Sequence, residues 1–133
     1  MKKKIIATIL VICLAAALLT ACGGGGGDLP DLSGTYECSD YGFDISALTF
    51  SSDGTVGLSM DWEYNGTYKK SGKQYVLSIT DGKSAVSDVL AKEREKAYKI
   101  TVTPDSDDTL TVHIKAKSGY IYYGKESAVF KKK

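Results

Sequence analysis

Histidine, cysteine and proline are scarce in this chain of 133 residues, which has one histidine, three cysteines and two prolines. A catalytic triad or a cysteine–histidine pair would have to use His113, the single histidine. Since His113 alternates with apolar residues, we expect it on a solvated face beside Thr111 and Lys115. A zinc site needs three or four ligands of this kind. We therefore expect no metal site, no cofactor, no catalytic residue and no enzymatic activity.

A strong excess of positive charge is also lacking, because 17 Lys and Arg residues face 16 Asp and Glu residues. Nucleic-acid binding needs a basic patch, so nucleic acid is excluded as a partner. The charge is unevenly spread, with eight acids and no basic residue over positions 22–68, and 14 basic and eight acidic residues from Lys69 onward. Either the acidic and basic regions are ordinary solvated surfaces, or the basic end with Lys131–Lys133 faces anionic lipid headgroups.

The N-terminus has the pattern of an export signal. Lys2, Lys3 and Lys4 precede a stretch of 17 almost entirely apolar residues, from Ile5 to Ala21. A charged start, an apolar centre and small residues at a cleavage site are typical of a secretory signal peptide. The apolar stretch is at the lower limit for crossing a bilayer, so an uncleaved single-span anchor is the alternative.

Leu19-Thr20-Ala21-Cys22 resembles the lipobox of bacterial lipoproteins, which has an aliphatic residue, two small residues and a cysteine. The resemblance implies cleavage between Ala21 and Cys22 and a lipid, with acyl chains such as palmitate, on the Cys22 thiol. It also implies an extracytoplasmic protein of the cell envelope whose partner is the membrane. Cys13 would be removed with the signal, and Cys38 would remain alone, so no intrachain disulfide is expected.

Three regions follow from this pattern: a signal peptide over 1–21, the lipidated cysteine and a glycine-rich linker over 22–31, and one domain over 32–133. Without the signal, 14 basic and 16 acidic residues remain, a net charge of −2. Five consecutive glycines, Gly23 to Gly27, predict a flexible tether.

The dominant pattern beyond the linker is strict alternation of apolar and polar residues. It occurs around positions 56–62, 75–79, 98–102 and 110–114. Turn residues separate these segments at 52–54, 71–72 and 105–108, and we expect Pro104 to end a strand. One dry and one wet face favour antiparallel pairing. The fold class is therefore mainly β: a single small antiparallel β-barrel or rolled sheet of about eight strands.

One segment departs from this alternation. Residues 84–96 contain good helix formers, with Asp88 near the start and basic residues near the end. We expect one short helix there, capped by Ser84 or Ser87; another hairpin is the alternative.

A weak repeat links two predicted strands, since Gly34-Thr35-Tyr36 recurs as Gly66-Thr67-Tyr68. This glycine–aromatic opening is similar to that of lipocalin-like barrels, which implies a barrel fold. We expect each tyrosine to cover an end of the core with its hydroxyl in water.

The aromatic content gives the candidate binding surface. The chain has nine Tyr, three Phe and one Trp. Any aromatic side chains left exposed would bind a protein partner or a small ligand; the candidates are Trp62, Tyr120, Tyr122 and Tyr123. We therefore expect a membrane-anchored binding or structural module of the envelope. The alternatives are an envelope hydrolase, for which Asp61 and Glu63 would be the carboxylate pair, and an inhibitor of an envelope enzyme.

Overall fold

The computed structural model describes residues 29–133. The predicted signal peptide, its cleavage site between Ala21 and Cys22, the lipid on Cys22 and most of the glycine-rich linker lie outside these residues.

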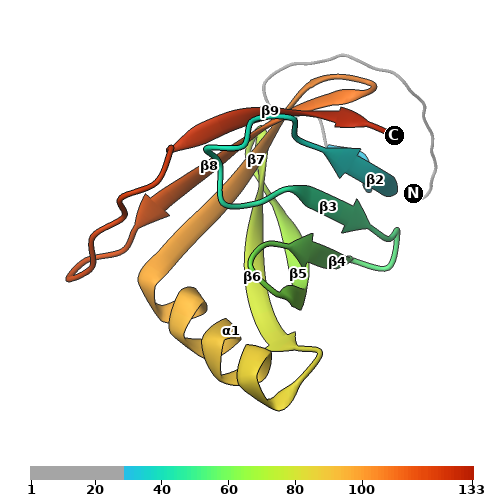
Figure 1. Cartoon of the computed structure of the whole chain (residues 1–133). Helices are drawn as coiled ribbons and strands as arrows, with labels where there is room; N and C mark the ends of the chain where they lie inside the picture. The colour runs from blue at the N-terminus through green and yellow to red at the C-terminus, as the bar shows by residue number, and fades with distance from the viewer. Residues whose placement is uncertain (1–28) are drawn as a thin grey trace, which may run out of the picture.

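Eight strands form a closed antiparallel barrel in which each strand pairs with its neighbours in the sequence, and the last pairs with the first (Figure 1). The strands are β2 (Gly34–Glu37), β3 (Ala47–Phe50), β4 (Thr55–Ser59), β5 (Glu63–Ser71), β6 (Gln74–Gly82), β7 (Tyr98–Ser106), β8 (Thr109–Ala116) and β9 (Ser127–Lys132). The prediction of a mainly β, eight-stranded antiparallel barrel with one helix is confirmed. The architecture is compatible with a lipocalin-like barrel.

Side chains fill the interior of the barrel, as expected when eight strands close on themselves. Alternate residues of most strands are buried, and Leu48, Leu58, Val112 and Phe130 have no exposed surface. A row of four rings crosses one end of the core in edge-to-face contacts. Tyr36, Phe50, Tyr68 and Tyr75 follow one another in this row with ring centroids 5.2–5.8 Å apart.

The helix α1 (Ala85–Ala97) connects β6 to β7 and confirms the helix predicted over 84–96. Ser84 is the N-cap: its hydroxyl accepts from the Ser87 amide at 3.1 Å, and the Ser87 hydroxyl accepts from the Ser84 amide at 2.9 Å. This reciprocal arrangement is a capping box. Ala91 packs without exposed surface against the barrel.

The helix covers a place where the pairing between two strands of the barrel is short. β6 pairs with β7 only over Tyr75–Leu77, opposite Ile100–Val102. Beyond this point the Ile79 amide has no strand partner and donates instead to the Glu95 carboxylate of α1, at 2.8 Å. The Glu95 side chain of the helix therefore takes the place of a β7 carbonyl as the acceptor for this amide.

Pro104 does not end a strand, contrary to the prediction. β7 continues to Ser106, and Pro104 lies beside a register shift in the pairing with β8. It also lies beyond the last residue that pairs with β6. A proline without an amide proton is tolerated at such a bulge because one ladder position is already lost.

Candidate functional site

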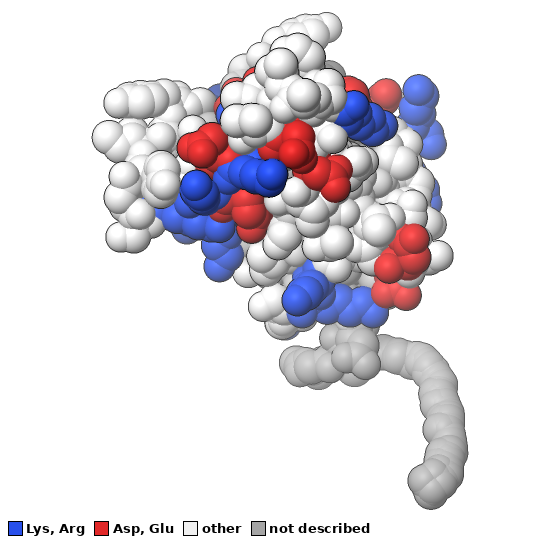
Figure 2. Space-filling view, turned by 90° about the horizontal axis from the view of Figure 1, so that it is seen from below, with Lys and Arg blue, Asp and Glu red and all other residues white. Residues whose placement is uncertain are grey.

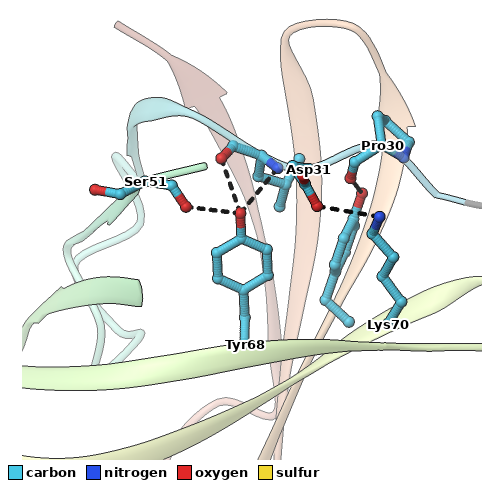
Figure 3. Close-up of polar contacts among 7 residues, drawn as sticks. Pro30, Asp31, Ser51, Tyr68 and Lys70 are labelled. Carbon is cyan, nitrogen blue, oxygen red and sulfur yellow. Dashed lines mark hydrogen bonds and ion pairs between the residues drawn. The ribbon is translucent and has the colours of Figure 1, made fainter. Parts of the chain in front are cut away.

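One end of the barrel is closed by the segment that precedes β2. The Leu32 amide donates to the Tyr68 hydroxyl at 3.1 Å (Figure 3). The carbonyl oxygens of Leu32 and Ser51 lie 2.9 and 2.8 Å from that hydroxyl, so its single proton has two acceptors. Leu32 is buried against the core. We call residues 29–33 the plug.

The plug is also held beyond Leu32. The Tyr75 hydroxyl donates to the Pro30 carbonyl, and the Lys70 ammonium lies 3.0 Å from the Asp31 carboxylate (Figure 3). Burial raises the pKa of Tyr75 to about 12. Leu29 packs against the core as well. Residues 29–31, assigned to the linker from sequence, thus contact the barrel.

The plug leaves part of this end open. A pocket of about 360 Å³ lies between the plug, the β7–β8 turn and the last residues of β9. The rings of Tyr36 and Tyr75 and the side chain of Leu110 form its inner wall, and Asp105 and Lys132 lie at its rim. We call it the mouth pocket.

Tyr36 is the distinctive residue of the mouth pocket. The residue is only 3% exposed, and its hydroxyl, which is not among the fully buried unpartnered polar atoms, has no hydrogen-bond partner among residues 29–133. Burial raises the pKa of Tyr36, and the carboxylates of Asp108 and Asp107 add to this. The Lys132 ammonium lies 5.9 Å from the centre of the ring.

The two tyrosines of the sequence repeat therefore differ. Both point into the barrel, as predicted, but the Tyr68 hydroxyl is bonded to the plug rather than to water. The glycines differ too. Gly34 adopts a positive φ of 95°, whereas Gly66 lies so close to β6 that a Cβ atom would be 2.3 Å from the Ser78 carbonyl oxygen.

The opposite end of the barrel carries most of the exposed apolar side chains. The β2–β3 loop presents Tyr41, which is fully exposed, and the β8–β9 loop presents Tyr120, Ile121 and Tyr123. Tyr123 is 89% exposed and Ile121 is 65% exposed. We call these four residues the distal loop surface. Figure 1 shows the β8–β9 loop at the far left, away from the C-terminus at the right.

The two loops of the distal loop surface are joined. Lys125 of one loop forms an ion pair with Asp40 of the other. Beneath this pair the ring of Phe43 packs edge-to-face on that of Phe130, with centroids 5.8 Å apart. A Cβ atom at Gly42 would be 2.9 Å from the Lys125 side chain, so the backbone of the first loop lies against the second.

Tyr122 anchors the β8–β9 loop to the barrel. Its ring packs edge-to-face on Tyr98, with centroids 5.2 Å apart. Burial and the nearby Asp44 carboxylate raise the pKa of Tyr122. The loop is tied at its start by the Lys117 amide, which donates to the Ala97 carbonyl at 2.8 Å.

Of the four predicted surface residues, three are exposed and one is not. Tyr120 and Tyr123 lie in the distal loop surface, and Trp62 is 44% exposed in the β4–β5 turn. Tyr122 is the anchor under the loop. Sequence reasoning missed Tyr41 and Ile121. For Tyr41 the only signal was a large aromatic inside a polar, glycine-containing loop.

The residues considered for catalysis lie apart. His113 is on the outer face of β8, between the buried Val112 and Ile114. Asp61 accepts from the Tyr64 hydroxyl at 3.0 Å and pairs with Arg94, while Glu63 accepts from the Ser59 hydroxyl at 2.9 Å. Among residues 29–133 no group of three His, Cys, Asp or Glu side chains is placed to hold a metal ion.

The charged surface around α1 is mixed. Figure 2 shows acidic and basic side chains next to each other on the face seen from below. Ion pairs account for much of this: Arg94 with Asp61, Lys92 with Asp88, Lys96 with Glu93 and Lys117 with Glu95. This face therefore has no extended positive electrostatic potential that would attract a polyanion.

The only helix within residues 29–133 is too short and too polar to cross a bilayer.

Comparisons with known proteins identify no family for this chain. No protein-family model matches the chain, and neither a curated protein nor a solved structure gives a significant match.

Proposed function

We propose that this protein is a lipid-anchored module of the cell envelope that binds a protein partner through its distal loop surface. The observation that carries the proposal is the exposure of Tyr41, Tyr120, Ile121 and Tyr123 on two loops that are joined to each other. Single exposed apolar residues are common on protein surfaces, but a group at one end of a molecule suggests an interface.

The chemistry of these residues suits protein recognition. Tyrosine offers a large contact area and loses little conformational entropy on binding, because it has only two side-chain torsions. Aromatic side chains are also enriched among the residues that contribute most of the binding energy at interfaces. Tyr122 and the Asp40–Lys125 pair hold the loops before binding, which lowers the entropy cost of ordering them.

The proposed anchor agrees with this arrangement. Residues 29–33 lie at the end of the barrel opposite the distal loop surface, so a lipid on Cys22 would leave that surface facing away from the membrane. Lys132 lines the mouth pocket beside the plug, so in this proposal the basic C-terminus would lie on the membrane side. Anchoring would also raise the effective concentration of the module for partners in the same envelope.

Mass spectrometry of the protein purified from envelopes tests the anchor. We expect a chain that begins at an acylated Cys22 and lacks residues 1–21. The Cys22→Ser variant should remain unprocessed and carry no lipid. An unmodified Cys22, or a retained signal in the wild-type protein, would refute this half of the proposal.

Site-directed photocrosslinking in intact cells tests the interface. A photoreactive amino acid at Tyr123 should give one discrete adduct, which the Tyr41→Ser substitution weakens. The same amino acid at Lys73, in the turn at the plug end, is the matched control and should give no such adduct. Equal adducts at both positions, or an adduct insensitive to Tyr41→Ser, would contradict the assignment.

A small ligand in the mouth pocket is a second candidate function, and the unpartnered Tyr36 hydroxyl favours it. A pocket of about 360 Å³ falls in the range of small-molecule sites, roughly 300–1,000 Å³. Native mass spectrometry of the envelope-purified protein would detect a retained molecule. Ser33→Trp, at the exposed rim, should abolish retention, whereas Tyr123→Ser should preserve it.

The proposal includes no catalysis. Asp61 and Glu63 already accept hydrogen bonds from Tyr64 and Ser59, and Asp61 is paired with Arg94. A hydrolase would need one of them protonated and unengaged.

A further inference from the structure

A hollow of about 250 Å³ lies on the outer wall of the barrel, away from the mouth pocket and from the distal loop surface. It spans β6, β7 and β8, and the side chains that line it are Gln74, Lys99, Thr101, His113 and Lys115. They point outward because they alternate with core residues on the same strands. The sheet therefore fixes their spacing.

Two lysines stand directly opposite each other in this hollow. Lys99 of β7 and Lys115 of β8 are register partners on the same face. Like charges in this position destabilise a sheet. Neither ammonium group lies within 4 Å of a carboxylate of residues 29–133, although Lys117 and Lys125 each have an acidic partner. The positive charge of the pair is thus uncompensated.

The remaining lining groups are also donors. Thr101 and His113 form the next outward register pair, and Gln74 lies beside them. None of the five side chains forms a hydrogen bond with another described residue of 29–133. Three other hollows of this surface each include carboxylates, such as Asp31, Glu37 or Asp81. This hollow differs from them in having no negative group.

We propose that this hollow binds a phosphate group, carried either by a free phosphate compound or by a lipid headgroup. A phosphate monoester carries a charge of about −1.5 to −2 near neutral pH and has three strong acceptor oxygens. Two ammonium groups match that charge, and the hydroxyl, imidazole and amide supply further donors. Bound phosphate would also relieve the repulsion between Lys99 and Lys115.

Calorimetry on the purified protein tests the proposal, with inorganic phosphate against chloride at equal ionic strength. We expect saturable binding of phosphate, weakened at least about tenfold by Lys99→Gln or by Lys115→Gln, the change that about 1.4 kcal/mol of lost interaction produces. Lys83→Gln is the matched control. Lys83 is exposed and unpaired but lies beyond the far end of β6, and this variant should bind as the wild-type protein does.

A second probe distinguishes the source of the phosphate. Dihexanoyl phosphatidic acid, used below its micelle concentration, carries a phosphate monoester on a lipid backbone. Tighter binding of this probe than of inorganic phosphate would indicate a lipid headgroup, and equal binding would indicate a free phosphate compound. Binding of neither probe, or equal loss in the Lys83→Gln control, would overturn the proposal.

Thermal unfolding separates lost binding from lost folding. In low salt without phosphate, Lys99→Gln should melt at a higher temperature than the wild-type protein, because the like-charge pair is removed. Added phosphate should raise the melting temperature of the wild-type protein more than that of Lys99→Gln, whose phosphate binding is weakened. An equal rise in the two proteins would contradict the assignment.

Discussion

The amide of Leu32 and the hydroxyl of Tyr68 are hydrogen-bonded at 3.1 Å across 36 positions of sequence. Tyr68 belongs to the fixed wall of the barrel and Leu32 to the plug, so this bond determines where the incoming chain meets the domain. The same hydroxyl has the carbonyls of Leu32 and Ser51 as acceptors. One side chain thus closes the end of the barrel that faces the tether.

Tyr68→Phe should destabilise the protein by about 1–3 kcal/mol, because a buried amide loses its acceptor and two carbonyls lose the hydroxyl proton that they share, while the ring stays in place. Urea unfolding followed by circular dichroism measures this change. Tyr36→Phe is the matched control, since its hydroxyl has no partner among residues 29–133. It should change stability by less than about 0.5 kcal/mol. Equal effects of the two substitutions would show that the plug does not depend on Tyr68.

Stability should fall as the pH rises above 10, and Tyr75 should contribute to the fall. The folded-state pKa of Tyr75 is raised by burial to about 12, above the ordinary value of 10. The stability that this shift reflects is fully present below pH 10 and is lost as the pH rises through about 12. At 1.36 kcal/mol for each pKa unit, the loss is at most about 2.7 kcal/mol.

Urea unfolding between pH 8 and pH 11.5 measures this dependence on pH. Tyr75→Phe should lower stability at neutral pH, because the bond to the Pro30 carbonyl is lost, but should flatten the decline above pH 10. Tyr41→Phe removes a fully exposed phenol and should leave the slope unchanged. If stability declines with pH equally steeply in Tyr75→Phe and in the wild-type protein, the pKa of Tyr75 is not raised by folding.

Local patterns in the sequence were sufficient to predict β4, β6, β7 and β8, and they favoured the helix over a further hairpin. Alternation places Val112 and Ile114 inside and His113 outside, and a strand enforces that period whatever it pairs with. The helix start was also readable, because Ser84 and Ser87 have the spacing of a capping box. What the sequence left open there was which serine is the cap.

Contacts between distant residues were not predictable in the same way. Leu29, Pro30 and Asp31 look like the end of a linker, and only the fold brings them to Tyr75 and Lys70, about 40 positions later. The exposure of the aromatic side chains likewise could not be predicted from the alternation of apolar and polar residues. Trp62 continues the alternation of β4 in the sequence, but β4 ends at Ser59, so the indole lies in a turn.

Gly66→Ala should destabilise the barrel, because the new Cβ atom would be 2.3 Å from the Ser78 carbonyl oxygen on β6. Forcing an extra carbon into such a contact costs about 1–3 kcal/mol. Gly57→Ala is the matched control on the neighbouring strand, where the nearest atom, in Thr49, is 3.9 Å away. That variant should stay within about 0.5 kcal/mol of the wild-type protein. Denaturant midpoints of the two variants, compared directly, decide whether β5 and β6 are packed this closely.

Glu95→Ala should destabilise the seam between β6 and β7. Glu95 accepts from the Ile79 amide at 2.8 Å, where that amide has no strand partner, and lies 3.7 Å from the Lys117 ammonium. Hydrogen bonds to charged groups contribute about 1.5–3 kcal/mol, so a loss of this size is expected.

Hydrogen exchange identifies the site of that loss. The Ile79 amide should exchange faster in Glu95→Ala, while the Val112 amide in the intact β8–β9 ladder should not respond. Glu93→Ala, on the same helix, is the matched control, because Glu93 is exposed and forms an ion pair with Lys96 at 3.7 Å. It should leave both amides and the unfolding midpoint nearly unchanged, since exposed ion pairs contribute about 0–1 kcal/mol. If both substitutions accelerate Ile79 equally, the cause is a weakened helix and not the lost acceptor, and α1 does not complete the barrel wall through Glu95.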